Sequence, residues 1–558
     1  MEGKVEKLSN DRPPTPAPRM RATIFHPLFS VIFLIVLCGF LFFYRLADRD
    51  LWSSHEGRAA QDAQTILREH RWGLPGLFDG KVELQKPPLY YWLVAGLAAL
   101  GNGQVDAFSV RLPAAGAALG CVLLLFGLGI HQHRRLAGTV AAAMLATAIH
   151  YTWLARTGRI DMPLTFAVAV ALVGFYLGHQ FRRQLRSRWA WAWLLVAYVA
   201  IAAAVLLKGP IGILLPAGVA ATSLWLEGEL PRLGEGRRWV RLTDELGLWW
   251  GIPLVLALDL PWYIWADLAT RGNLVRVFFW KHNFERGFGG GTLAAHPWWF
   301  YGPRLAFDFL PWSLVLPIGV WLVIRRRWWQ EDPEARFGLA WLAVMVVLLS
   351  CFRFKRADYL LPAYPGAAWF LGCVAERYYR SVQVRGRLVA GFASILAACT
   401  LGWWVYLGYV LPGEETSHEF RRFAEEIRRR APAPQLILFF RAEAHALAFH
   451  VGPPVDTILE WENLDIWSSR PGTYYVVMPP ENAAEWQRYL KLGQLEEVLR
   501  SSDLAQGGHA HPLVLLRTRP GAGPLSASEG SDSYPGFGTQ KAHPCPTSSN
   551  DRRSRRPH

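Results

Sequence analysis

Acidic and basic side chains occur together in the segment that follows the first apolar block of the chain. The run Ser53-Ser54-His55-Glu56-Gly57-Arg58 places a carboxylate and an arginine beside a membrane-embedded segment, where charge is costly and therefore indicates a functional site. Glu56 could act as a general base on an acceptor hydroxyl, and Arg58 could bind a phosphate. The alternative is structural, because Ser53 followed three residues later by Glu56 is also the pattern of a helix-capping box.

A lysine in a rigid stretch of backbone follows on the same loop. In Lys86-Pro87-Pro88-Leu89-Tyr90-Tyr91-Trp92, two prolines restrict the backbone where the lysine leaves the loop, so that its ammonium is held at the membrane interface. Tyr90 and its aromatic neighbours are typical of an interfacial belt and could also line a path for a lipid. Anchoring explains the aromatic residues, but it does not explain the lysine.

Two further charges stand at the ends of predicted spanning helices. Asp161 precedes Met162-Pro163 at the start of an apolar block, where a carboxylate can simply complement the helix dipole. Lys208 stands at a Gly209-Pro210 break in a long apolar run, and broken helices at membrane depth usually line a cavity. Both residues are therefore candidates for one site, with dipole complementation as the alternative for Asp161.

Two later segments combine cations with amide or aromatic groups. His282 and Asn283 precede a glycine-rich run at 287–291, a combination typical of a mobile lid over a site, and a surface loop anchored by tryptophan is the alternative. The turn at 353–359 contains Lys355 and ends at Tyr359. Its cations suit a phosphate ligand.

The elements that carry these residues are predominantly membrane-spanning helices. Of the 558 residues, 52% are hydrophobic, and they recur in blocks of about twenty, the length that crosses a ~30 Å hydrocarbon core. Spans are predicted near 25–45, 112–131, 136–155, 161–180, 189–207, 209–227, 246–267, 304–325, 336–354, 359–377 and 388–411. We therefore expect an all-α polytopic membrane protein with about 11 to 13 transmembrane helices.

The distribution of basic residues predicts the orientation of these spans. The net charge of +15 lies in short clusters between apolar blocks, as the positive-inside rule expects, which argues against a nucleic-acid-binding protein. Residues 1–24 are polar and are expected in the cytoplasm, ahead of an uncleaved first helix. All basic loops are cytoplasmic only if the apolar segment 88–103 does not fully cross. Loops 46–87 and 268–303 and the turns at Asp161, Lys208 and Lys355 are then outside, where basic residues indicate an anionic ligand.

The composition changes after about Pro412 to that of a small soluble domain. Residues 415–430 favour a charged helix, 436–440, 474–478 and 513–516 favour short strands, and 483–492 favour a second helix. We expect a transmembrane domain over 25–411, an extracytoplasmic α/β domain over 412–520 and a disordered tail over 521–558. The six cysteines show no metal-ligand or disulfide spacing.

Taken in order, the motifs resemble those of a group of membrane enzymes. They are Glu56-Gly57-Arg58, Lys86-Pro87-Pro88-Leu89-Tyr90-Tyr91-Trp92, Arg111-Leu112-Pro113, Asp161-Met162-Pro163-Leu164, Lys208-Gly209-Pro210, His282-Asn283-Phe284-Glu285-Arg286, Leu310-Pro311-Trp312 and Leu361-Pro362-Ala363-Tyr364-Pro365. From about residue 25 to 380, the sequence resembles the bacterial aminoarabinose lipid A transferase and protein O-mannosyltransferase group of membrane glycosyltransferases.

The resemblance implies a C-type glycosyltransferase fold in the bacterial cytoplasmic membrane, with an active site on the periplasmic face. Such an enzyme passes a sugar from a polyprenyl-phosphate carrier to a lipid A, envelope glycan or protein acceptor. By the same resemblance, Lys86 and Arg58 bind the donor phosphate, and Glu56 and Asp161 form an acidic site. The residues that line or complete the substrate site are then Lys208, His282, Lys355, Tyr90, Asn283 and Tyr359.

One position departs from the family pattern. The family usually has an acid immediately before the position of Glu56, and this chain has His55, whose unperturbed pKa of about 6.5 suits a general base. His55 therefore joins Glu56 and Asp161 as a catalytic candidate. The alternatives are that Glu56 or Asp161 works alone, or that activity is lost. The need for a divalent metal stays open. The alternatives are a transporter or flippase of lipid-linked sugars, against which the lack of a visible repeat argues, and a non-catalytic polyprenyl-phosphate-binding protein.

Overall fold

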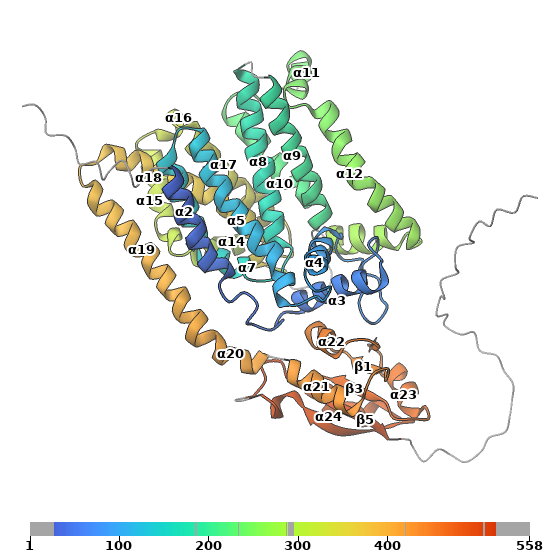
Figure 1. The fold of residues 1–558 in the computed structure, drawn as a ribbon. Coiled ribbons are helices and arrows are strands. Elements are labelled where there is room, and N and C mark those ends of the chain that lie inside the picture. Colours follow the sequence, from blue (N-terminus) through green and yellow to red (C-terminus); the bar gives the residue numbers. More distant parts are fainter. Residues whose placement is uncertain are drawn as a thin grey trace, which may run out of the picture.

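The computed structural model describes residues 27–184, 187–232, 234–285, 287, 289, 295–418, 420–505 and 508–519. These residues form a helical bundle with a smaller α/β domain against one end of it (Figure 1). The expected cytoplasmic segment 1–24 and the expected disordered tail 521–558 lie outside the described residues.

The bundle is built from apolar helices that coincide with the predicted spans. Within the described residues, six stretches are long and apolar enough to cross a membrane: α5 (Ala107–His131), α8 (Asp161–Arg183), α9 (Ser187–Lys208), α12 (Leu248–Ala269), α17 (Pro333–Ser350) and the stretch that begins with α19 (Arg385–Val405). The segments Trp298–Asp308 and Trp312–Arg325, which are bent by 115°, make a seventh if they are one broken span. The prediction of a polytopic helical membrane protein is confirmed.

The other predicted spans are helical as well, but shorter or more polar. They correspond to α2 with η1 (Pro27–Cys38, Gly39–Phe43), α6 with α7 (Arg135–Thr147, Ile149–Ala155), α10 (Ile211–Leu226), and η5 with α18 (Ala357–Ala363, Tyr364–Ser381). The segment that was predicted not to cross forms α4 (Leu89–Leu100), whose 12 residues are fewer than the ~20 that a span needs. Helix α4 packs against α3 (Ser54–Glu69) at one end of the bundle (Figure 1).

The direction of the helices gathers the candidate residues at that same end. Helix α8 begins at Asp161, α9 ends at Lys208, α17 ends at Ser350 and α18 begins at Tyr364. Helices α8 and α9 pack closely because Gly174 has no side chain: a Cβ there would lie 2.9 Å from the Cβ of Ala197. Close packing of an antiparallel pair therefore brings the first residue of α8 next to the last residue of α9.

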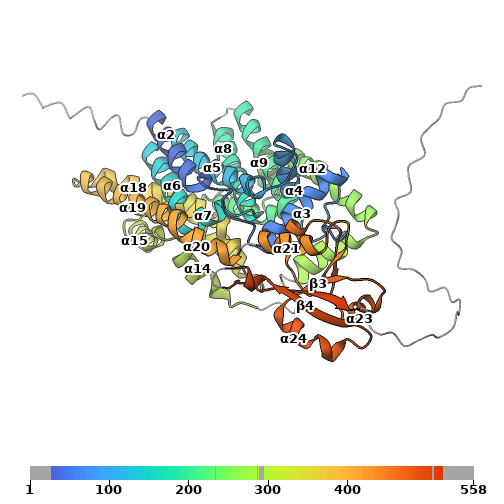
Figure 2. The ribbon, with the colours of Figure 1, turned by 60° about the horizontal axis from the view of Figure 1, so that its bottom comes forward.

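The C-terminal domain is an α/β domain with one five-stranded sheet. The sheet order is β2-β1-β3-β5-β4, formed by β2 (Val455–Ile458), β1 (Ile437–Phe440), β3 (Tyr475–Met478), β5 (Val514–Arg519) and β4 (Gln494–Arg500). Strand β1 pairs in parallel with β2 and β3, whereas β5 pairs in an antiparallel way with β3 and β4. Its helices are α21 (Arg421–Arg430), α22 (His445–Val451), α23 (Trp461–Ser469) and α24 (Pro480–Tyr489) (Figure 2).

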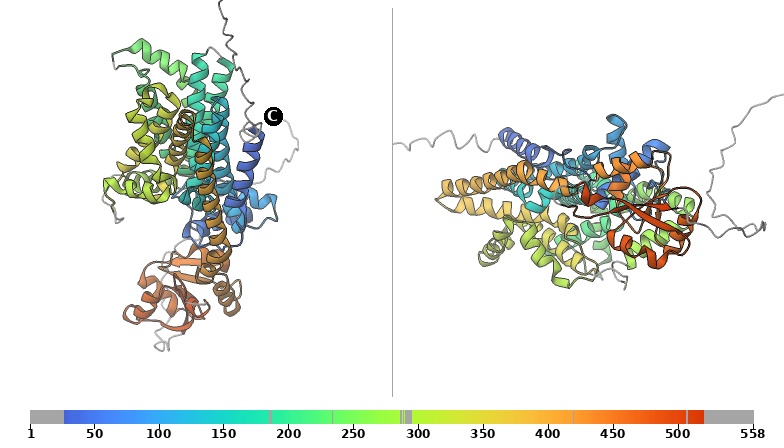
Figure 3. Two further views of the ribbon diagram at one scale, coloured as in Figure 1. Left: turned by 90° about the vertical axis from the view of Figure 1, so that its left-hand side faces the viewer. Right: turned by 90° about the horizontal axis from the view of Figure 1, so that it is seen from below.

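Helix α22 faces the bundle and contacts α3 (Figure 1). The chain reaches this domain along α19, which runs down the side of the bundle and continues through η6 (Tyr406–Val410) into α20 (Leu411–His418) (Figure 3). Strands β1, β3 and β5 agree with the predicted positions. Strands β2 and β4 were missed, and the predicted helix at 415–430 is two helices, α20 and α21.

Candidate active site

A basic cavity of about 80 Å³ lies where loop 46–87, the start of α8 and the end of α9 meet. Its lining contains His55, Arg58, Gln85, Lys86, Tyr90, Arg159, Asp161, Lys208, Arg356 and Tyr359. A neighbouring cavity of about 110 Å³ shares Lys86, Asp161, Lys208 and Tyr359 with it and adds His282 and Asn283. Nine of the eleven predicted site residues therefore line one of two adjoining cavities, and Glu56 and Lys355 do not.

An ion pair between two spanning helices forms the centre of the basic cavity. The Nζ of Lys208 donates to Oδ1 of Asp161 at 2.5 Å and lies 4.0 Å from the centroid of the Tyr359 ring. The Nε of Arg159 is 3.5 Å from the other carboxylate oxygen of Asp161. Asp161 is therefore not only a helix-dipole charge, because it holds two cations at the cavity wall.

The charge network extends to residues that were not predicted from the sequence to belong to the site. The Nη1 of Arg159 is 2.7 Å from Oδ2 of Asp358, and the Nε of Arg356 is 3.6 Å from the same oxygen. On the other side of Asp358, Nε2 of His150 is 3.4 Å from Oδ1. Arg159 and Arg356 stand next to predicted residues, but no spacing in the sequence indicates that His150 approaches Asp358.

The two predicted phosphate ligands are held by a residue that was also missed. Oε2 of Glu83 lies 3.2 Å from Nη1 of Arg58, and Oε1 of Glu83 accepts a hydrogen bond from the backbone nitrogen of Gln85 at 2.6 Å. Glu83 thus fixes the guanidinium of Arg58 and the backbone just before Lys86. The Nη2 of Arg58 is also 3.1 Å from Nε2 of His445, which belongs to the C-terminal domain.

Glu56 does not line either of the two cavities and lies buried beside the basic one. Its fully buried carboxylate pairs with Nε of Arg111 at 2.7 Å and Nη2 of Arg49 at 3.0 Å. It also accepts the backbone N–H of Gly158 at 2.9 Å, in the loop that leads to Asp161. Burial alone would raise the pKa of Glu56, but the charges of Arg111 and Arg49 outweigh it and lower the pKa to about 2. The carboxylate therefore joins the loop before Asp161 to Arg111 and Arg49.

The capping alternative for the same segment is supported by the geometry. Oγ of Ser53 accepts the backbone N–H of Glu56 at 3.1 Å, so that Ser53 is the N-cap of α3. His55, one residue earlier than Glu56, does line the cavity and is accessible to solvent there. The surrounding protein and the cations Arg159 and Arg356 lower the pKa of His55 well below its usual value. Its imidazole is therefore neutral at physiological pH.

Lys355 was predicted to line the substrate site, but it lines neither of the two cavities. Its Nζ donates to the backbone oxygens of His296, at 3.1 Å, and Phe352. The ammonium thereby fixes the turn between α17 and η5, and the cation from this turn that lines the basic cavity is Arg356. The lid predicted around the glycine-rich run lies largely outside the described residues, as does Arg286.

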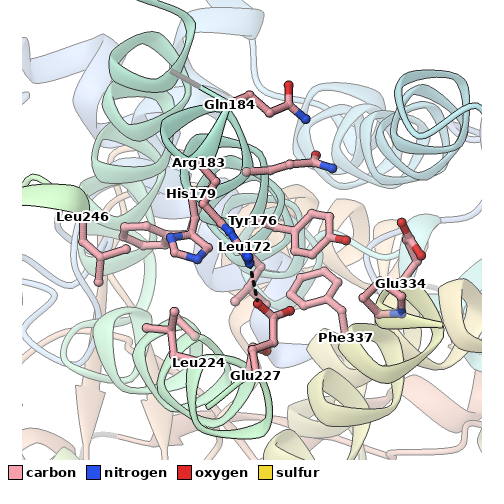
Figure 4. Close-up of a pocket in the computed structure, with 15 residues that line it drawn as sticks. Leu172, Tyr176, His179, Arg183, Gln184, Leu224, Glu227, Leu246, Glu334 and Phe337 are labelled. Atoms are coloured by element: carbon pink, nitrogen blue, oxygen red, sulfur yellow. Dashed lines mark ion pairs between the residues drawn. The ribbon is translucent and has the colours of Figure 1, made fainter. Parts of the chain in front are cut away.

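A third, larger cavity of about 310 Å³ lies at the opposite ends of α8 and α10. Beside it, His179, Glu227 and Glu229 are close enough together to hold a metal ion. Arg183 already pairs with both carboxylates, at 2.7 Å from Glu229 and 3.9 Å from Glu227. Figure 4 shows the pair with Glu227. This group is far along α8 from Asp161, and the described residues of the basic cavity include no such metal-binding group.

Comparisons with known proteins find similarity to a described family in part of the chain. Residues 61–271 match the family model described as dolichyl-phosphate-mannose-protein mannosyltransferase. The match covers less than half of the chain. The matched region contains Lys86, Asp161 and Lys208, and the resemblance inferred from the motifs is confirmed.

Curated relatives agree with the same group. An undecaprenyl phosphate-alpha-4-amino-4-deoxy-L-arabinose arabinosyl transferase from Pseudomonas aeruginosa (strain LESB58) is 30% identical over 361 residues, which are 63% of this chain and 61% of the relative. A relative from Aquifex aeolicus, described as uncharacterized, is 26% identical over 346 residues, 60% of this chain and 62% of its own length. The chain thus matches about three fifths of the length of these relatives.

Solved structures show the fold. ArnT from Cupriavidus metallidurans, solved with bound undecaprenyl phosphate, aligns with a TM-score of 0.70 at 17% identity, covering 87% of this chain and 97% of that one. The oligosaccharyltransferase of Archaeoglobus fulgidus, solved with a tethered acceptor peptide, aligns with a TM-score of 0.53 at 12% identity, covering 84% and 71%. The C-type glycosyltransferase fold expected from the motifs is confirmed.

Proposed function

We propose that this chain is a membrane glycosyltransferase that moves a sugar from a polyprenyl-phosphate donor to an acceptor at the periplasmic face. One observation carries the proposal: five cationic side chains line the basic cavity beside a single lining carboxylate, Asp161. The cations are Arg58, Lys86, Arg159, Lys208 and Arg356. Such an excess of positive charge at a membrane interface suits the phosphate of a lipid carrier.

The reaction is a single displacement at the anomeric carbon. An acceptor oxygen forms the new bond to that carbon, and the bond to the phosphate oxygen breaks with its electron pair leaving on the polyprenyl phosphate. Lys86 and Arg58 stabilise the charge on the leaving phosphate, because preorganised cations in a water-poor site act where charge develops. The configuration at the anomeric carbon is inverted.

The charge state of the cavity favours an acceptor that is already ionised. His55 is neutral with a lowered pKa, which makes it a weak proton acceptor, and Asp161 is paired with Lys208 and Arg159. A hydroxyl acceptor needs a general base, whereas a phosphate oxygen does not. A phosphate-bearing envelope lipid is therefore the preferred acceptor, and a pentose such as the one in the relatives' name is the preferred sugar.

The orientation in the membrane follows from the charges at the other end of the bundle. Arg134 lies between α5 and α6, Arg135 begins α6, and Arg182 and Arg183 end α8. Arg325 ends α15 (Leu316–Arg325). The positive-inside rule assigns that end to the cytoplasm. The basic cavity and the C-terminal domain then face the periplasm.

Lipid extracts provide the test. Cells with the gene, without it, and with a Lys86→Ala copy are compared by mass spectrometry of their envelope lipids. We expect one sugar-modified, phosphate-bearing lipid to be present only with the wild-type gene. A flippase would change the sidedness of the donor without forming product in a detergent assay with purified protein and a synthetic donor. Absence of product in both assays would contradict the proposal.

A further inference from the structure

The C-terminal domain packs against the loop that carries the candidate phosphate ligands. Helix α22 lies on α3 so closely that a Cβ at Gly57 would be 2.3 Å from the backbone nitrogen of Ala446. The Nε2 of Gln61 donates to the backbone oxygen of His445 at 2.8 Å. These contacts place the first residue of α22 directly over the first turns of α3.

A second set of contacts fixes the same interface further from the cavity. Nε2 of His450, near the end of α22, lies 2.8 Å from Oδ1 of Asp50. The Nζ of Lys81 donates to the backbone oxygen of Thr457 at 3.1 Å. Loop 46–87 is thus bound to the C-terminal domain on both sides of α3, and the domain is not a loosely tethered appendage.

His445, in this domain, contacts Arg58, which lines the basic cavity. Its Nε2 lies 3.1 Å from Nη2 of Arg58, while Oε2 of Glu83 holds Nη1 of the same guanidinium at 3.2 Å. Burial, together with the charge of Arg58, lowers the pKa of His445 to about 4. The imidazole is therefore neutral and accepts the hydrogen bond. A guanidinium has five donors, so three remain for a phosphate after these two contacts.

We infer that His445 is a positioning residue for the donor phosphate, which acts by holding Arg58 between itself and Glu83. This inference rests on the proposed function. A flexible arginine must lose conformational freedom when it binds a phosphate, and a guanidinium that is already clamped loses less. The C-terminal domain then contributes to donor affinity although it supplies no ligand to the donor.

The test is the affinity of the full-length, detergent-solubilised protein for undecaprenyl phosphate, measured by ligand titration of thermal unfolding. His445→Phe keeps a ring of similar size and removes the acceptor, and we expect about tenfold weaker binding, since a hydrogen bond to a charged group is worth about 1.5 kcal/mol or more. His445→Gln restores an acceptor and should bind within about threefold of wild type. His445→Leu replaces the Phe variant if that one does not fold.

Two controls distinguish an effect of His445 on Arg58 from an effect on the packing of the C-terminal domain. His450→Leu weakens the same interface without touching Arg58, and it should lower the unfolding temperature while leaving donor affinity unchanged. In an Arg58→Ala background, His445→Phe should cause no further loss of affinity, because the residue acts through Arg58.

Three results would overturn the inference. They are wild-type affinity in a folded His445→Phe protein, an equal loss of affinity in His450→Leu, and a full additional loss in the Arg58→Ala background. Failure of the wild-type protein to bind undecaprenyl phosphate is a different outcome, since it contradicts the proposed function itself. His511→Leu, at an exposed position of the same domain, reports any general effect of losing a histidine.

Discussion

At the scale of single residues, the charges of this protein fall into two groups with different tasks. Lys86, Lys208 and Arg356 line the basic cavity, whereas Glu56, Arg111 and Lys355 are buried and hold backbone in place. Arg111 donates to the backbone oxygens of residues 46, 49 and 50 in addition to Glu56. Motif residues such as Glu56 and Arg111 are thus buried and are absent from the lining of the basic cavity.

Lys86→Ala should abolish transfer while the protein still folds. Lys86 lines both adjoining cavities, and its removal takes away a charge that stabilises the leaving phosphate. The measurement is product formation with purified protein, with the unfolding temperature as a check on folding. Lys81→Ala on the same loop is the matched control, because that lysine is largely exposed, and it should retain activity. An active Lys86→Ala enzyme would remove Lys86 from the phosphate site.

Glu56→Gln should lower the free energy of unfolding of the protein. The amide keeps an acceptor for Gly158 but leaves Arg111 and Arg49 without a counter-charge in a buried site, which costs about 3 to 5 kcal/mol. Thermal unfolding in detergent should show a clear decrease relative to wild type. A Gln variant of unchanged stability and no activity would instead restore Glu56 as a base.

Acidification should weaken the folded state through His445. Its pKa is lowered to about 4 in the folded protein, so the unfolded chain binds a proton at a higher pH than the folded one. The contribution is fully present above about pH 6.5 and is lost as the pH falls toward 4. The unfolding temperature of wild type should therefore decrease more between pH 7.5 and pH 5 than that of His445→Gln. Equal decreases would contradict a buried neutral His445.

The site could be predicted in part because its ligands lie in recognisable local motifs. Arg58, Lys86, Asp161 and Lys208 each stand beside a proline, a glycine or a helix start. Glu83 and His445 have no such signal: Glu83 lies in an irregular loop, and His445 meets Arg58 across 387 residues of sequence. Long-range partners of this kind depend on how the domains dock, which no local pattern records.

At the scale of elements, the junction of α9 and α10 determines where Lys208 stands. Gly209 has φ +79°, and a Cβ there would lie 2.5 Å from Cζ of Phe278, in the segment η2 (Val275–Glu285) that carries His282 and Asn283. The glycine therefore allows two walls of the neighbouring cavity to approach each other. The Gly209-Pro210 break that was noted in the sequence is a tight turn beside the cavity.

Gly209→Ala should lower both stability and transfer. The left-handed backbone costs an alanine about 1 kcal/mol, and the methyl group also displaces Phe278 and with it η2. Gly228→Ala is the matched control, since Gly228 has φ +71° but open space around its Cβ position. The control should lose some stability and keep its activity. Equal activity in the two variants would show that the approach of Phe278 has no role in the site.

Helical elements were easier to predict than the sheet. Long apolar blocks give a continuous signal over about twenty residues, and each predicted span is helical in the structure. Strand β2 is only Val455–Ile458 with two half-buried residues, and β4 is interrupted by a bulge near Glu497. Neither presents a clear alternation, so pairing with β1 and β5 makes these segments strands.

At the scale of the whole molecule, the two ends of the bundle differ in the charges that they carry. One end has the basic cavity and the docked C-terminal domain (Figures 1 and 3), and the other has the arginines at the ends of α8, α15 and α18. The proposed orientation puts the first end outside the cytoplasm. This assignment can be tested without any substrate.

Single cysteines should report the orientation. In a background without the native cysteines, positions 81 and 421 should react with an impermeant thiol reagent on intact spheroplasts, whereas positions 183, 238 and 380 should react only after permeabilisation. All five side chains are exposed in the structure, so reactivity depends on sidedness. Labelling of position 183 or 380 in intact spheroplasts would reverse the orientation and contradict a periplasmic site.

The contact between α22 and α3 also has a consequence for the order of events during synthesis. Arg58 emerges early, and its partner His445 is made 387 residues later, about 20 to 80 seconds at usual translation rates. Until then loop 46–87 lacks its contacts with the C-terminal domain. A chain that is released early carries Lys86 and Arg58 but lacks their support. The contact that holds Arg58 from the second side can therefore form only after α22 has been synthesised.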